Sequence, residues 1–258
     1  MHFSKVLLCL LLTVAGTWLL WPTAGQSGGI HLLAGAGLRQ PTDRLVDMFV
    51  QETGTEVHVS YGGAGQLMAQ YLVTGEGDLF MPGAYSYIEK LQARQMIAAV
   101  EPIVLHTPVL AVNPKMVAEV TCLKDLCRPK LRVGLGDPAS MALGRLAEEI
   151  LVKAGLLAQV KSHVTVYAAT VKQLALYVAR GYVDAAIIAR ADAFQYENQV
   201  VMVTIPPDYY QPEIIAVGRL RSAADETAAC RLQRFLSSRI ARKVYADFGF
   251  LPLSPQGQ

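Results

Sequence analysis

Short apolar runs alternate along this chain with segments in which apolar residues recur every three or four positions. The run at 30–34 precedes a helical pattern at 40–52, where Pro41 suits the first turn. The runs at 57–61 and 78–81 precede helical patterns in the same way. Repeated strand–helix units of this kind predict an α/β fold with largely parallel sheets.

A second series of strand–helix units begins after the apolar run at 109–112. Its helical patterns lie at 140–154, with a clear apolar stripe, and at 170–180, where Thr170 and Gln173 have the spacing of a capping box. Further strands are expected at 131–134, 164–167, 185–188 and 214–217. The two series predict two α/β lobes, with the end of the chain returning to the first lobe.

The first 25 residues have the pattern of a secretory signal peptide. Lys5 is the one charged residue among them, the apolar run 6–21 follows it, and Pro22 and small residues come next. The apolar run is shorter than the roughly 20 residues that cross a bilayer core. We therefore expect export to the periplasm or beyond, with an uncleaved N-terminal membrane anchor as the alternative. Cys9 lies inside the run rather than at its end, which argues against lipid attachment.

Composition and charge narrow the class of protein. With 258 residues, 52% of them hydrophobic and 17% charged, the chain can bury a large core. Its net charge of +2 argues against a nucleic-acid binder with a broad cationic face. The five histidines lack metal-ligand spacing, and no Gly-x-Ser-x-Gly motif surrounds Ser60 or Ser140. We therefore expect no enzymatic activity, no cofactor and no metal.

The cysteines bear on the compartment. Cys122 and Cys127 are separated by four residues, a spacing that a helical turn or short loop can close into a disulfide in an oxidising compartment. A metal site is the alternative, but no histidine lies nearby with zinc-site spacing. The sequence thus predicts a disulfide between these two residues and leaves Cys230 as a small buried apolar residue.

Two of the expected strands end in small-residue turns, at 34–37 and 62–65, and a helix follows each turn. Backbone N–H groups at the positive end of a helix dipole can bind an anion, although glycine can also simply permit a tight turn. A dinucleotide site is disfavoured because Gln40 stands where the third glycine of that fingerprint belongs. The turn at 62–65 lacks the Lys and Ser/Thr of a P-loop.

Taken in order, several short motifs of this chain resemble the periplasmic molybdate/tungstate-binding proteins of ABC transporters. They are Ala34-Gly-Ala-Gly-Leu38, Ser60-Tyr-Gly-Gly-Ala-Gly65, Gly77-Asp-Leu-Phe80, Gly136-Asp-Pro138, Ala185-Ala-Ile-Ile-Ala189 and Tyr245-Ala-Asp-Phe-Gly-Phe250. The resemblance implies a type 2 periplasmic-binding-protein fold, in which two crossover strands join the lobes and the ligand lies in the cleft between them. Lobe 1 would comprise 28–107 and 217–258, and lobe 2 would comprise 108–216.

The resemblance also locates a ligand site, with a departure from the family. The positions at which the family carries hydroxyl donors correspond here to Gly37, Ala64 and Ala189, which have no side-chain donor. The two backbone donors of the second lobe correspond to Leu143 and Val171, where any side chain is compatible. The resemblance therefore implies that the cleft is retained while its hydroxyl lining is lost.

Other side chains are candidates for replacing those donors. Arg39 and Arg190 each lie within two residues of a vacated position, and an arginine can supply both charge and directional hydrogen bonds. Both can equally be solvent-facing helix residues. Further candidates on the cleft-facing segments are Tyr61, Ser140, Thr170, Tyr209 and Tyr210.

These observations together predict an extracytoplasmic solute-binding protein of an ABC importer. We expect a monomer that captures a small oxyanion similar to molybdate or tungstate and presents it to a membrane permease. Two alternatives stay open. The closed lobes could signal to a membrane sensor kinase, or the cleft could hold a different anion or an organic solute. Loss of the three hydroxyl groups favours a different or larger ligand.

Overall fold

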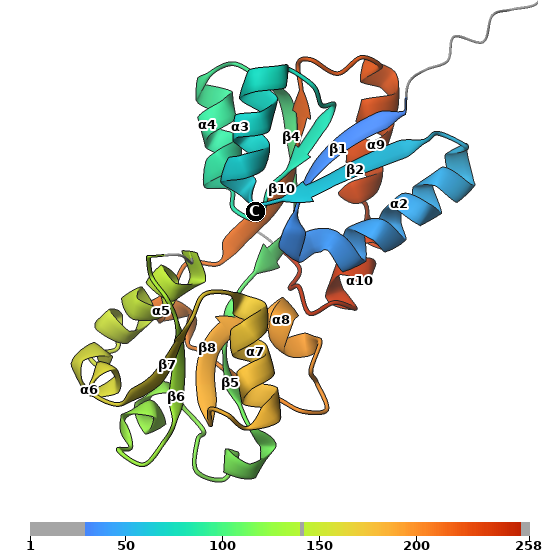
Figure 1. The fold of residues 1–258 in the computed structure, drawn as a ribbon. Coiled ribbons are helices and arrows are strands. Elements are labelled where there is room, and N and C mark those ends of the chain that lie inside the picture. The colour runs from blue at the N-terminus through green and yellow to red at the C-terminus, as the bar shows by residue number, and fades with distance from the viewer. Residues whose placement is uncertain (1–28, 140–141, 254–258) are drawn as a thin grey trace, which may run out of the picture.

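The computed structural model describes residues 29–139 and 142–253, which form two α/β lobes (Figure 1). This arrangement confirms the predicted fold class. The predicted signal peptide at 1–25 and the candidate Ser140 lie outside the described residues. Within the described ranges, no helix combines the length and the apolar character that crossing a membrane requires.

The first lobe is built on a five-stranded mixed sheet. Its strand order is β2-β1-β3-β10-β4, with β1 parallel to β2 and β3, and β10 antiparallel to β3 and β4. The strands are β1 (Ile30–Gly35), β2 (Val57–Gly62), β3 (Leu79–Met81), β4 (Ile97–His106) and β10 (Glu213–Leu220). Strand β10 belongs to this sheet although it follows the whole second lobe in the sequence.

The second lobe has a sheet of the same size. Its order is β7-β6-β8-β5-β9, with β6 parallel to β7 and β8, and β5 antiparallel to β8 and β9. The strands are β5 (Pro108–Val112), β6 (Val133–Gly136), β7 (Val164–Ala168), β8 (Ala185–Ala189) and β9 (Val201–Thr204).

Helices cover both faces of each sheet (Figure 1). In the first lobe they are α2 (Arg39–Thr53), α3 (Ala64–Thr74), α4 (Ser86–Ala93), α9 (Glu226–Leu236) and α10 (Arg239–Ala246). In the second lobe they are α5 (Ala142–Lys153), α6 (Leu157–Lys161), α7 (Val171–Arg180) and α8 (Arg190–Phe194). Short 3-10 helices are η1 (Ala36–Leu38), η2 (Pro114–Met116), η3 (Leu123–Cys127) and η4 (Pro207–Tyr209).

Each sheet separates two apolar cores, one on each of its faces. In the first lobe, β1 sends Leu32 toward the side of α2, α9 and α10, and Leu33 toward the side of α3 and α4. In the second lobe, Ile187 and Ile188 of β8 divide in the same way between the two faces. This alternation is why the strands are continuously apolar, as expected of strands covered on both sides.

Two short segments connect the lobes. Thr107 links β4 to β5, and residues 205–212 link β9 to β10. Because Glu213 already pairs with His106 in the first sheet, the chain re-enters that sheet slightly before residue 217. Within the described residues, we propose lobe limits of 29–107 with 213–253 for the first lobe, and 108–212 for the second.

The predicted disulfide is not formed in the structure, where Cys122 and Cys127 are free thiols. Asp125 closes the loop in its place: its Oδ2 accepts hydrogen bonds from the Thr121 and Cys122 N–H groups at 2.9 and 3.1 Å. These hydrogen bonds lower the pKa of Asp125 to about 2. Cys127 instead packs against the core of the second lobe, and this burial raises the pKa of its thiol.

Candidate functional site

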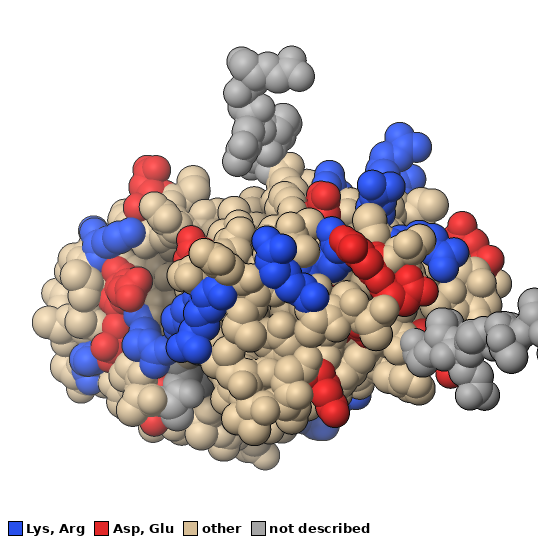
Figure 2. Space-filling view, turned by 90° about the horizontal axis from the view of Figure 1, so that it is seen from above, with Lys and Arg blue, Asp and Glu red and all other residues tan. Residues whose placement is uncertain are grey.

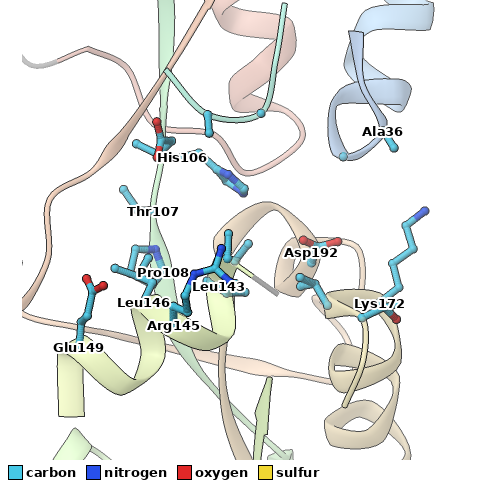
Figure 3. Close-up of a pocket in the computed structure, with 18 of the residues that line it drawn as sticks. Ala36, His106, Thr107, Pro108, Leu143, Arg145, Leu146, Glu149, Lys172 and Asp192 are labelled. Carbon is cyan, nitrogen blue, oxygen red and sulfur yellow. The ribbon is translucent and has the colours of Figure 1, made fainter. Parts of the chain in front are cut away.

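A cavity of about 670 Å³ lies between the lobes (Figure 3). The first lobe contributes Ala36, Gly37, Gly83 and Ala84. The segments around the two crossovers contribute His106, Thr107, Pro108, Gln211 and Glu213. The second lobe contributes Ala142, Leu143, Arg145, Leu146, Glu149, Thr170, Val171, Lys172, Ala189 and Asp192.

Five of the twelve candidate ligand-binding positions expected from the sequence line this cavity. They are Gly37, Leu143, Thr170, Val171 and Ala189. All five lie where a strand ends and a helix begins, so that the connection between the two elements faces the other lobe.

Helices α5 and α7 both begin at the cavity. At the start of α7, Thr170 has extended backbone angles, and its hydroxyl accepts a hydrogen bond from the Gln173 N–H at 3.2 Å. The first N–H groups of a helix have no acceptor within the helix and lie at the positive end of its dipole. The second lobe therefore presents backbone donors and partial positive charge to the cavity without a metal ion.

Three expected residues lie on the first lobe outside the cavity lining: Arg39, Tyr61 and Ala64. The Arg39 guanidinium stacks 4.0 Å from the centre of the Tyr61 ring. The Tyr61 hydroxyl donates a hydrogen bond to Asp43 Oδ1 at 2.5 Å. Burial, and then this hydrogen bond, raise the pKa of Tyr61. Arg39 and Tyr61 thus engage each other rather than the cavity.

Arg190, the other candidate arginine, also lies outside the cavity lining. Its backbone N–H donates to the Thr107 carbonyl at 2.8 Å, and its buried Nε has no hydrogen-bond partner among the described residues. Tyr210 lies on the crossover at 205–212, and burial raises its pKa. The positive charge of Arg190 opposes that rise. Arg190 therefore lies beside the two crossovers and not in the lining of the cavity.

Sequence reasoning missed the charged residues that do line the cavity. Arg145, Lys172 and Asp192 occupy the first turns of α5, α7 and α8. Arg145 and Lys172 are two residues or fewer from Leu143 and Val171, and Asp192 is three residues from Ala189; the resemblance marks these three positions. Their position in the sequence could have identified them. The first turn of a helix that follows a cleft-facing strand end also borders the cleft.

Burial shifts the pKa values of two groups of the cavity, His106 and Asp192. Figure 3 shows His106 and Asp192 directed into the space between the lobes. Burial lowers the pKa of His106 to about 4, so its ring is neutral at pH 7. Burial raises the pKa of Asp192 to about 6, and the nearby charge of Lys172 opposes that rise. The Phe250 ring, 5.3 Å from the His106 ring, helps to enclose the imidazole.

Other polar groups of the cavity already have partners. Glu213 Oε1 accepts a hydrogen bond from the Tyr85 N–H at 2.6 Å, so the start of α4 holds a carboxylate from the protein itself. Arg145 Nη1 donates to the Pro138 carbonyl at 2.9 Å, which leaves other guanidinium N–H groups of Arg145 for further contacts. The surface beyond the cleft carries interspersed acidic and basic side chains on the face that Figure 2 shows.

The chain is similar to known binding proteins over most of its length. Residues 30–251 match the family described as bacterial extracellular solute-binding protein. A candidate binding protein of Haemophilus influenzae is 37% identical over 88% of this chain and 92% of its own length. A candidate ABC transporter substrate-binding lipoprotein of Bacillus subtilis, YvgL, is 28% identical over 74% of each chain.

A solved structure has the same fold. The substrate-binding domain of a candidate molybdenum ABC transporter from Clostridium difficile superposes with a TM-score of 0.79 and 21% identity. The superposition covers 88% of this chain and 99% of that domain. With the family match spanning nearly all described residues, this protein belongs to the bacterial extracellular solute-binding proteins, which bind solutes and are not enzymes.

Proposed function

We propose that this protein captures a small oxyanion in the cavity between its lobes and delivers it to the membrane permease of an ABC importer. The observation that carries this proposal is that α5 and α7 both begin at the cavity. Their first N–H groups stabilise negative charge. The names of the Bacillus subtilis and Clostridium difficile proteins support the assignment to an ABC transporter.

In the proposed complex the anion contacts backbone more than side chains. Leu143 and Val171 supply N–H groups, while Gly37 and Ala189 border the anion from the two lobes. Lys172, at the start of α7, adds a positive charge. No cluster of three or more metal-ligating side chains lies among the described residues.

Molybdate and tungstate are the reference ligands for this proposal, but the missing hydroxyl groups weaken the case for them. A neutral hydrogen bond contributes about 0.5 to 1.5 kcal/mol, so the loss of the two donors at Gly37 and Ala189, which line the cavity, weakens binding by up to roughly two orders of magnitude. A cavity of about 670 Å³ also falls in the range that holds organic ligands. We therefore favour an oxyanion that belongs to a larger solute.

The place of action follows from the first residues of the chain. We propose that residues 1–25 direct export and that the mature protein works in the periplasm or outside the cell as a monomer. If the apolar run 6–21 is retained, it tethers the protein to the membrane beside its permease.

Calorimetric titration of the exported protein tests the function. The probes are molybdate, tungstate, sulfate, phosphate and small organic phosphates and carboxylates. We expect at least one oxyanion to bind, and Lys172→Ala to weaken it about tenfold or more, because Lys172 supplies a charge-assisted contact. Lys153→Ala, at the far end of α5, is the matched control and should leave affinity unchanged. If none of these oxyanions binds, the proposed function is wrong.

A further inference from the structure

Asp192 differs from the other acidic residues that the folded protein encloses. The buried Asp78 carboxylate accepts hydrogen bonds from the His31 and Ala224 N–H groups at 2.7 and 2.8 Å. The buried Asp184 pairs with Arg132 at 2.5 Å. Asp192 is partly buried in the cavity lining, and it accepts no hydrogen bond and forms no ion pair among the described residues.

The unpartnered carboxylate is open toward the cavity. Figure 3 shows it directed into the space between the lobes, with Lys172 on the same side. Lys172 is the cation whose charge acts on it. The other charged groups of the cavity are Arg145 and Glu149 on α5 and Glu213 on β10, and His106 across the space is neutral at pH 7.

A partly buried carboxylate without a hydrogen bond is unfavourable, and a bound solute can remove that penalty. The solute must then offer an O–H or N–H group. A bare dianion such as molybdate or sulfate carries no proton near neutral pH, so it would add a like charge beside Asp192. The Asp192 carboxylate therefore favours an anion that carries an O–H or N–H group and repels a bare dianion.

We propose that Asp192 selects the solute, which carries an oxyanion group at the starts of α5 and α7 and a hydroxyl group that donates to the Asp192 carboxylate. This inference rests on the proposed function. The ligand class is a hydroxylated organic oxyanion, such as a phosphorylated or carboxylated polyol. The cavity of about 670 Å³ has room for such a molecule, whereas four oxygens at roughly 30 Å³ each fill only a small part of it.

Two pairs of probes separate the hydroxyl group from the oxyanion. Glycerol 3-phosphate is compared with methyl phosphate, and glycerate with propionate, by calorimetry at pH 7.5. At least one hydroxylated probe should bind ten times more tightly than its partner. Asp192→Ala should reduce that preference to less than threefold. Asp192→Asn, which keeps the shape and removes the charge, should raise the affinity for molybdate and sulfate at least tenfold.

Glu119→Gln and Glu119→Ala are the matched controls, since Glu119 is an exposed carboxylate of the second lobe outside the cavity lining. Neither should change the preference. The inference is overturned if Asp192→Ala keeps the full preference, or if the native protein binds molybdate as tightly as the hydroxylated probes. If no oxyanion binds either the native protein or Asp192→Asn, the proposed function fails and this inference fails with it.

Discussion

Gly37 borders the cavity, and a Cβ atom added to it would meet no other atom within 4 Å. A serine at this position would therefore fit and would add a donor close to the proposed oxyanion. We expect Gly37→Ser to strengthen binding of the preferred oxyanion about two- to tenfold, the equivalent of one neutral hydrogen bond. Calorimetric titration measures the change.

Ala64→Ser is the control for that substitution. Ala64 begins α3 outside the cavity lining, so an added hydroxyl there should leave the affinity unchanged. An equal gain from both serines would contradict the geometry of the site. A loss of affinity in Gly37→Ser, with stability retained, would mean that the solute itself occupies the open space.

Asp192 also makes stability depend on pH. Its pKa in the folded protein is about 6, above the ordinary 3.8, so the folded state holds the extra proton between these pH values. The contribution of Asp192 to the free energy of unfolding therefore falls as pH rises from about 4 to about 6. We expect Asp192→Asn to stabilise the ligand-free protein by about 1 to 3 kcal/mol at pH 7.5 and not at pH 4.

Urea denaturation from pH 4 to pH 8 tests this prediction. His106 has the opposite sign, because its pKa of about 4 lies below its ordinary value of 6.5, and its contribution is lost as pH falls. Subtracting the native curve from that of Asp192→Asn removes the His106 contribution. Asp47→Asn, on the exposed side of α2, controls for the loss of a carboxylate. A difference that is constant across the pH range would refute the assignment.

Helix α5 reaches the cavity because a glycine lets it approach β6 closely. A Cβ atom on Gly144 would lie 2.6 Å from the Gly136 carbonyl oxygen. Alanine favours a helix more than glycine does, but here it would push α5 away from the strand. We expect Gly144→Ala to lower the free energy of unfolding by about 1 to 3 kcal/mol. Urea denaturation measures the loss, and weaker oxyanion binding should accompany it.

Gly65→Ala in α3 is the comparison for that prediction. Its added Cβ would meet the hydroxyl end of Tyr87 at 3.3 Å, a group that can move aside. We expect a change of less than about 0.5 kcal/mol. If both alanines prove harmless, close approach does not determine where α5 lies.

The elements that the sequence predicted well are those with a regular apolar period. The helix expected at 40–52 is α2, Arg39–Thr53, and the parallel strands lie where apolar runs predicted them. Strands β4 and β9 were not predicted. Both are edge strands, and in β4 the exposed Glu101 and Pro102 interrupt the apolar pattern. Antiparallel edge pairing follows from tertiary contacts that no local period records.

The cavity was predictable only in part for a related reason. The family resemblance implies positions such as Leu143 and Val171, and both line the cavity. Which charged side chains face inward depends on how one lobe sits against the other. Arg39 lies close in sequence to Gly37, yet its stacking on Tyr61 engages it elsewhere. Lys172 was not singled out, yet it lines the cavity.

The two lobes also touch through the end of the chain. After α10, Leu251 pairs with Leu105 of β4, and the Phe250 ring lies beside His106. Gly249 lies against α8 of the second lobe, the helix that carries Asp192. The C-terminal segment of the first lobe thus supports a wall of the cavity in the second lobe.

Gly249 is the residue on which this contact depends. Its φ of +83° favours glycine, and a Cβ atom would lie 2.7 Å from Phe194 Cβ. We expect Gly249→Ala to lower the free energy of unfolding by about 2 to 4 kcal/mol, from backbone strain together with overpacking. Because α8 must shift to relieve the clash, oxyanion affinity should fall severalfold as well. Urea denaturation and calorimetric titration measure the two effects.

Gly54→Ala separates backbone strain from the contact between the lobes. Gly54 ends α2 with a φ of +67°, and an added Cβ there would meet nothing within 4 Å. This variant should lose only about 1 kcal/mol and keep its full affinity. If Gly249→Ala behaves like Gly54→Ala in both measurements, the C-terminal segment does not position α8. A larger loss of stability with affinity intact would mean that the segment joins the lobes without shaping the cavity.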